Sequence, residues 1–151
     1  MKKIFFILFF LIYFSQSAVI AKTSSDLDNL IAENAGSYYM SWLIVREFKE
    51  SKCGYAINLK LDDINNLIND VESQIYNQIS YKDKKKFNKV KKTSPSYSKK
   101  IVEETINDLF SKNKNPEEYN CFYICGHAMG TLITNIQNWK RILEYRDKVN
   151  Q

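Results

Sequence analysis

Three cysteines and a single histidine carry the most distinctive side-chain chemistry of this chain. Cys121, Cys125 and His127 lie close together in the sequence, and Cys53 lies far upstream of them. At 100° per helical residue, Cys121 and Cys125 share one side of a helix, whereas His127 points about 120° to 160° away from both. These three side chains therefore cannot converge on one metal ion, and Cys125 with His127 makes a poor nucleophile and base pair. No metal, cofactor or catalytic residue is predicted.

In an oxidising compartment, three cysteines predict one disulfide and one spare thiol. Cys121 and Cys125 lie one turn apart with nearly parallel side-chain directions, so Cys53 is expected to pair with one of them. If the first long helix ends at Cys53 and packs antiparallel to the last one, Cys121 lies closer than Cys125 to the level of Cys53 along the helix axes. We therefore predict a Cys53–Cys121 disulfide with Cys125 as a buried thiol, and a Cys53–Cys125 pairing is the alternative.

The first 21 residues have the pattern of a cleaved signal peptide. Lys2 and Lys3 precede an unbroken apolar run over residues 4–14, and a cleavage site follows near Ala21, with Val19 and Ala21 as its small residues. This run is too short to span a bilayer, which requires about 20 residues. Richness in Lys, Asn, Ile, Tyr and Phe is typical of an AT-rich bacterial genome. We therefore predict a periplasmic or secreted protein whose mature chain, residues 22–151, forms a single helical domain.

The mature chain has only a small excess of positive charge. Without Lys2 and Lys3, 20 basic and 17 acidic residues remain, which gives a net charge of +3. Such a charge does not by itself indicate a polyanionic partner, and nucleic acid is not expected as a partner of an exported protein. No second apolar run approaches the length of a membrane span.

The spacing of apolar residues predicts an all-α fold, a compact bundle of about four helices. Their expected ranges are 25–53, 62–92, 98–112 and 116–146. The first helix is expected to be largely enclosed and to end at Cys53, with Gly54 in the left-handed cap conformation. The second is expected to bury one narrow stripe. A non-helical segment is predicted between the second and third helices, at Thr93, Ser94, Pro95 and Ser96.

The last helix has the clearest start signal and the widest apolar face. Asn115 can cap it and Pro116 suits the first helical position. His127 falls on its polar side, so an exposed histidine is expected. Gly126 and Gly130, one turn apart, predict the close approach of another backbone, and a kink is the alternative.

A run of nine lysines with one acidic residue extends from Lys82 to Lys100. This run contains the candidate interaction surface, which consists of Lys84, Lys85, Lys86, Phe87 and Lys89. Aromatic residues interleaved with lysines occur in binders of anionic surfaces. A solvated, mobile hairpin tip is the simpler interpretation.

The resulting plan is that of a small, exported, helical protein with one disulfide and no recognisable catalytic set. It is similar to the plan of periplasmic inhibitors such as immunity proteins against secreted toxins. This similarity implies a non-enzymatic protein that binds and covers a partner protein, with an acidic surface as one possibility. The alternative is a small periplasmic hydrolase or thiol-dependent enzyme with an unrecognised site.

Overall fold

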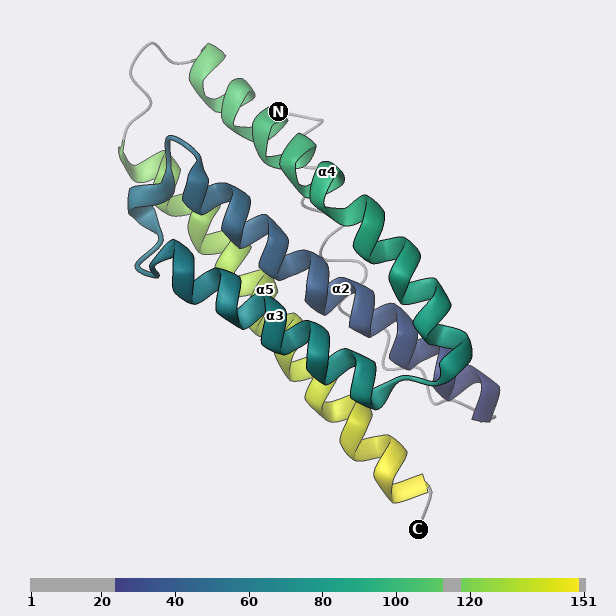
Figure 1. Ribbon diagram of the computed structural model, residues 1–151. Coiled ribbons are helices and arrows are strands. Elements are labelled where there is room, and N and C mark those ends of the chain that lie inside the picture. The colour runs from purple at the N-terminus through teal and green to yellow at the C-terminus, as the bar shows by residue number, and fades with distance from the viewer. Residues whose placement is uncertain (1–23, 113–117, 150–151) are drawn as a thin grey trace.

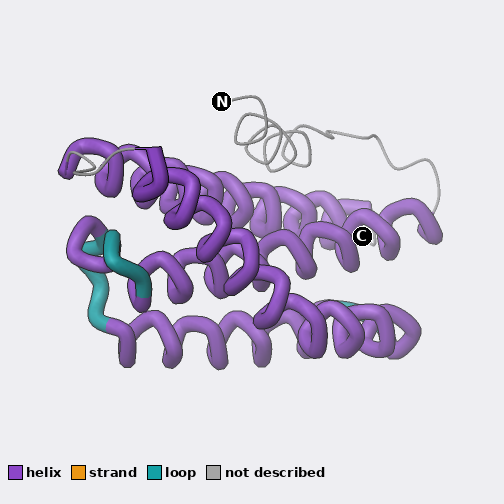
Figure 2. The backbone as a smooth tube through the Cα atoms, turned by 90° about the horizontal axis from the view of Figure 1, so that it is seen from above, coloured by secondary structure: helices purple, strands orange, loops and turns teal. Residues whose placement is uncertain are grey.

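The computed structural model describes residues 24–112 and 118–149, which form four α-helices and one short 3-10 turn. The helices are α2 (Ser24–Glu50), α3 (Leu61–Gln78), α4 (Tyr81–Lys112) and α5 (Glu118–Val149), and the turn η1 (Gly54–Ala56) follows α2. No strand occurs among the described residues (Figure 2). The predicted all-α fold of four helices is thereby confirmed. The predicted signal peptide and the Asn115–Pro116 helix start lie outside the described residues.

The helix α2 is the centre of the fold, and α3, α4 and α5 each pack against it. The chain reverses direction from one helix to the next, so that α2 and α4 run one way and α3 and α5 the other (Figure 1). Residues 41–45 of α2 are all buried, and five consecutive buried residues cover every side of a helix. The prediction that this helix is largely enclosed is confirmed.

Contacts at the middle and at the end of α5 fix its position. The side-chain amide of Asn135 donates a hydrogen bond to Ser41 Oγ at 2.8 Å. Near the end of α5, the guanidinium of Arg146 donates to the backbone oxygen of Gln78 at 2.9 Å and to its side-chain oxygen at 2.8 Å. These bonds tie α5 to α2 and to the end of α3, in the antiparallel arrangement on which the choice of Cys121 depends.

The end of α2 differs from the prediction. The helix ends at Glu50 rather than at Cys53, and no described glycine has a positive φ. Lys49 replaces the expected left-handed cap, because its ammonium donates hydrogen bonds to the carbonyl oxygens of Gly54 at 3.1 Å and Ile57 at 2.9 Å. Gly54 is nevertheless required, since a Cβ on it would lie 2.0 Å from the backbone oxygen of Lys49.

The boundary between the second and third helices was predicted in the wrong place. It lies at Ile79 and Ser80, so residues 62–92 are not one helix. Ile79 is extended, and Ser80 begins the next helix by accepting the backbone N–H of Asp83 at its Oγ, 3.2 Å away. Ser80 Oγ also donates to the Asp83 carboxylate at 2.6 Å. This reciprocal arrangement resembles a capping box, which the Ser-x-x-Asp spacing could have indicated.

The predicted break at Thr93–Ser96 is absent, and α4 continues through Pro95. A proline inside a helix costs about 3 kcal/mol, because it removes one hydrogen bond and clashes with the preceding turn. Buried residues lie on both sides of the proline. They are Phe87 and Ser94 before it and Ser98, Val102 and Ile106 after it. We infer that the packing of this face against α2 offsets the cost of the proline.

Candidate functional site

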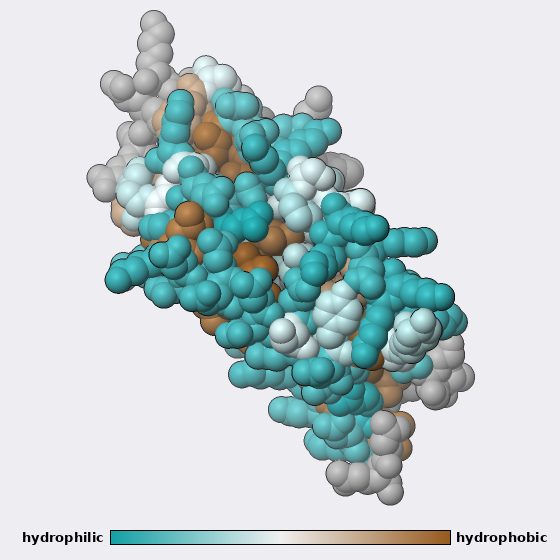
Figure 3. Space-filling model, viewed as in Figure 1, coloured by the Kyte–Doolittle hydropathy of each residue, from teal (hydrophilic) through white to brown (hydrophobic). Residues whose placement is uncertain are grey.

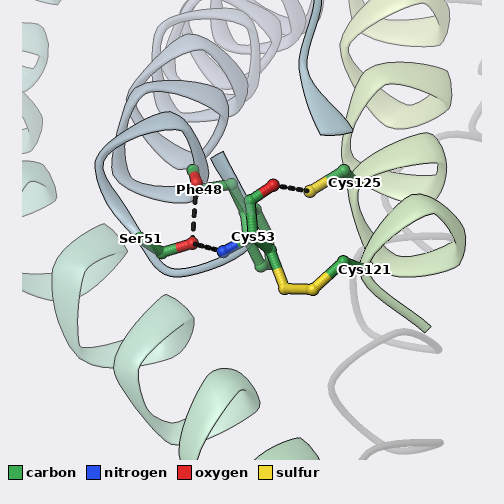
Figure 4. Close-up of a disulfide and its surroundings, with 5 residues drawn as sticks. All are labelled: Phe48, Ser51, Cys53, Cys121 and Cys125. Carbon is green, nitrogen blue, oxygen red and sulfur yellow. Dashed lines mark hydrogen bonds between the residues drawn. A yellow bond between two sulfur atoms is a disulfide. The ribbon is translucent and has the colours of Figure 1, made fainter. Parts of the chain in front are cut away.

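Cys53 and Cys121 form a disulfide, as predicted, with their Cα atoms 5.1 Å apart (Figure 4). Ser51 holds the backbone of Cys53 in place, because its Oγ accepts the Cys53 N–H at 3.1 Å and donates to the Phe48 carbonyl at 2.7 Å. The bond joins the segment after α2 to the first turns of α5. A disulfide of this kind is compatible with a protein that functions outside the cytoplasm.

The third cysteine is enclosed beside this bond. Cys125 is only 1% exposed, and its Sγ donates a hydrogen bond to the Cys53 carbonyl over 3.6 Å. Burial raises the pKa of the Cys125 thiol from 9.0 to about 11. The thiol therefore stays protonated at neutral pH, whereas the thiolate is the form that acts as a nucleophile.

His127 lies on the outer side of α5, as predicted. It is exposed, and its ring packs edge-on against Tyr123 with 4.5 Å between the ring centroids. The buried Cys125 and the exposed His127 are thus on different sides of the helix. Within the described ranges, no group of three or more His, Cys, Asp or Glu side chains is placed to hold a metal ion.

Phe87 was wrongly assigned to the candidate interaction surface. It is 2% exposed, and its ring lies between those of Tyr39 and Tyr76, with 5.4 Å between the centroids of each pair. It is a core residue because it shares the inward face of α4 with Asp83 and Ser94. The lysine run is therefore part of a packed helix, and the hairpin tip of the simpler interpretation does not form.

The structure divides the nine lysines between Lys82 and Lys100 into two main groups. Four of them have a carboxylate partner: Lys86 with Asp83, Lys91 with Glu72, Lys99 with Glu103, and Lys100 with Glu104. Lys84 is half-buried. The remaining four lysines are exposed and form no ion pair within the part of the chain that the structure describes. We call this set the lysine ridge; its members are Lys82, Lys85, Lys89 and Lys92.

Residues at spacings of three and four lie on one side of a helix, so the lysine ridge forms a single line along α4. The ten residues from Lys82 to Lys92 correspond to a length of about 15 Å at 1.5 Å per residue. Tyr81, which is 79% exposed, lies at its start, and the Lys85 ammonium is 5.6 Å from the centre of that ring. The surface along α4 is mostly hydrophilic (Figure 3). Of the predicted surface residues, Lys85 and Lys89 therefore belong to this line, whereas Lys86 is engaged by Asp83.

A second exposed surface lies on α5. Nothing lies within 4 Å of a Cβ placed on Gly126 or Gly130, so the predicted close approach of another backbone does not occur within the described part of the chain. Each glycine lowers the stability of a helix interior by about 1 kcal/mol relative to alanine. We call this surface the α5 apolar face; its members are Phe122, Gly126, Met129, Gly130 and Ile133. Phe122 and Ile133 are 49% and 52% exposed.

Comparison of the chain with protein-family models, with curated proteins and with solved structures gives no match. Among the described residues, no helix is both long enough and apolar enough to cross a membrane.

Proposed function

We propose that this chain is an exported, non-enzymatic protein that binds and covers the acidic surface of a partner protein through the lysine ridge. By analogy of plan, it acts as a periplasmic inhibitor of the immunity type. The signal-peptide pattern of residues 1–21 supports export, and so does the disulfide, because such bonds persist in oxidising compartments.

The observation that carries the proposal is the contrast between the two groups of lysines on one helix. Four lysines of the run lie within 4.0 Å of a carboxylate, whereas the four of the lysine ridge have no such partner among the residues that the structure describes. Between Tyr81 and Lys92 there are seven lysines and one acidic residue, Asp83, which is buried. The ridge therefore presents concentrated positive charge without a counterion from residues 24–112 or 118–149, and an acidic partner surface would complement it.

The backbone beneath the ridge is held in place by packing. Asp83 and Phe87 are buried on the opposite side of the same turns, and Ser80 caps the start of the helix. A helical backbone fixes the spacing of the four ammonium groups before binding, so less conformational entropy is lost than in a disordered basic segment. A surface of this kind increases the rate of association and selects partners by charge.

Two matched charge reversals test the proposal. The variant Lys85→Glu/Lys89→Glu alters the ridge, and Lys99→Glu/Lys100→Glu changes the net charge equally at lysines that are already paired. Binding partners are captured from periplasmic extract on immobilised wild-type protein and on each variant. The ridge variant should lose the acidic partner that the wild type and the control retain, and added salt should weaken the wild-type complex. Equal capture by all three proteins would exclude the ridge as the binding surface.

A further inference from the structure

Most of the α5 apolar face is exposed, because only Met129 of its five members is half-buried against the core. At 100° per residue, its five members fall within an arc of about 100° that is centred about 90° around the helix from Cys125. Tyr55 extends this surface from η1, because its ring packs edge-on against Phe122 with 5.9 Å between the centroids. Tyr55 and Tyr123 are 56% and 52% exposed. Four large side chains that are each about half exposed thus surround two open glycines.

The face is complementary in shape to itself when two copies of α5 run antiparallel. With a two-fold axis between Met129 and Gly130, Gly126 of one copy lies opposite Ile133 of the other, and Met129 lies opposite Gly130. Ile133 and Met129 then each meet a glycine of the other copy, and each glycine allows the two helix backbones to approach closely. Because the axis repeats every contact, the match occurs twice, as an isologous interface requires.

We propose that the α5 apolar face is a homodimer interface, in which α5 of one copy packs antiparallel against α5 of a second copy. A large aromatic or aliphatic side chain buries roughly 200 Å², so four that are half exposed supply about 400 Å² per copy. A standard interface buries about 800 Å² per partner, so the proposed dimer has a small interface and is expected to be weak. The lysine ridge lies on α4, so this inference is independent of the proposed function.

Sedimentation equilibrium of the mature protein tests self-association directly. We expect a monomer–dimer equilibrium with a dissociation constant of about 10–100 μM, as suits an interface of modest apolar area. Ile133→Lys should raise this constant about tenfold or more. The matched control is Leu67→Lys, which introduces the same charge at a residue of α3 that is 37% exposed, and it should leave the constant unchanged. A wild-type protein that remains monomeric at millimolar concentration would overturn the proposal, even if the face then bound a helix of another protein.

A second variant distinguishes close helix packing from nonspecific association of apolar surfaces. Gly126→Leu adds apolar surface and has room in the monomer, where nothing lies within 4 Å of the new Cβ. If the glycine accommodates Ile133 of the second copy, this variant should weaken the dimer by about tenfold or more. Stronger association of Gly126→Leu would overturn the close-packed interface. Thermal unfolding confirms that each variant is folded.

Oxidative cross-linking tests the antiparallel register. In the proposed dimer, residue 130 lies beside the axis and residue 137 lies opposite Phe122. Gly130→Cys should therefore form a cross-linked dimer, and Gln137→Cys should not. In a parallel pair each residue lies opposite the same residue of the second copy. Cross-linking of both variants to the same extent would therefore overturn the antiparallel arrangement.

Discussion

The thiol of Cys125 donates a hydrogen bond to the backbone carbonyl of Cys53, with 3.6 Å between sulfur and oxygen. Cys53 is thus held by both cysteines of α5, through a covalent bond to Cys121 and a hydrogen bond from Cys125. The end of α2 and the first turns of α5 meet at this cluster. The two contacts differ greatly in strength, and substitutions should separate them.

Loss of the disulfide should cost more than loss of the third thiol. Cys53→Ser and Cys121→Ser should each lower the free energy of unfolding by roughly 2–5 kcal/mol, because the unfolded chain gains freedom. Cys125→Ala should lower it by about 1 kcal/mol and leave the bridge intact. Urea denaturation and peptide mapping without reductant measure these effects. A Cys125→Ala variant less stable than Cys121→Ser would contradict the assignment.

The raised pKa of the same thiol predicts that the folded protein loses stability at alkaline pH. The folded state holds the Cys125 proton up to about pH 11, whereas the thiol of the unfolded chain ionises near its ordinary pKa of 9.0. The unfolded state therefore binds fewer protons between these values, and the free energy of unfolding falls as pH rises through this window. A difference of two units corresponds to roughly 2–3 kcal/mol at most.

Burial also raises the pKa of Tyr38 and Tyr39, so both contribute to alkaline destabilisation in the same direction. The comparison of wild type with Cys125→Ala isolates the thiol. Urea denaturation at several pH values between 8 and 11 should give parallel curves at the lower end and a smaller decline for the variant above pH 9. Identical declines would mean that Cys125 titrates normally.

The glycines of this chain should respond to alanine in opposite directions. Gly126→Ala and Gly130→Ala should each raise the free energy of unfolding by about 0.5–1 kcal/mol, since alanine favours helix and meets nothing within 4 Å. Gly54→Ala should lower it by roughly 2–4 kcal/mol, because the new Cβ would lie 2.0 Å from the Lys49 oxygen. Thermal unfolding of dilute, monomeric protein measures both effects.

Pro95 should be replaceable with a gain in stability. Pro95→Ala restores one backbone N–H within α4 and removes the ring that clashes with the preceding turn, so we expect a gain of about 1–2 kcal/mol. The exposed neighbour Ser96 provides a control, and Ser96→Ala should change the stability by less than about 0.5 kcal/mol. If Pro95→Ala unfolds at a lower temperature than the wild type, the proline contributes packing that exceeds its local cost.

The sequence determined the features that depend on one helix at a time. The wide apolar arc of the first helix predicted that this helix is well buried, and 100° per residue placed His127 outside and Cys125 inside. The order of the helices and the height of Cys121 along its helix then selected Cys121 as the partner of Cys53. Each of these predictions needs only a helical period and an antiparallel neighbour, and the structure confirms each.

Tertiary structure decided the features that depend on what lies beside a helix. Pro95 is a strong local signal for a break, yet packing on both sides of it keeps α4 whole. Phe87 stands among lysines in the sequence, but α4 turns it towards Tyr39 and Tyr76. Gly126 and Gly130 predicted a neighbouring backbone, and α5 instead leaves them exposed. A local pattern gives the direction of a side chain relative to its own helix axis, whereas contact with other helices determines whether that direction leads to core or to solvent.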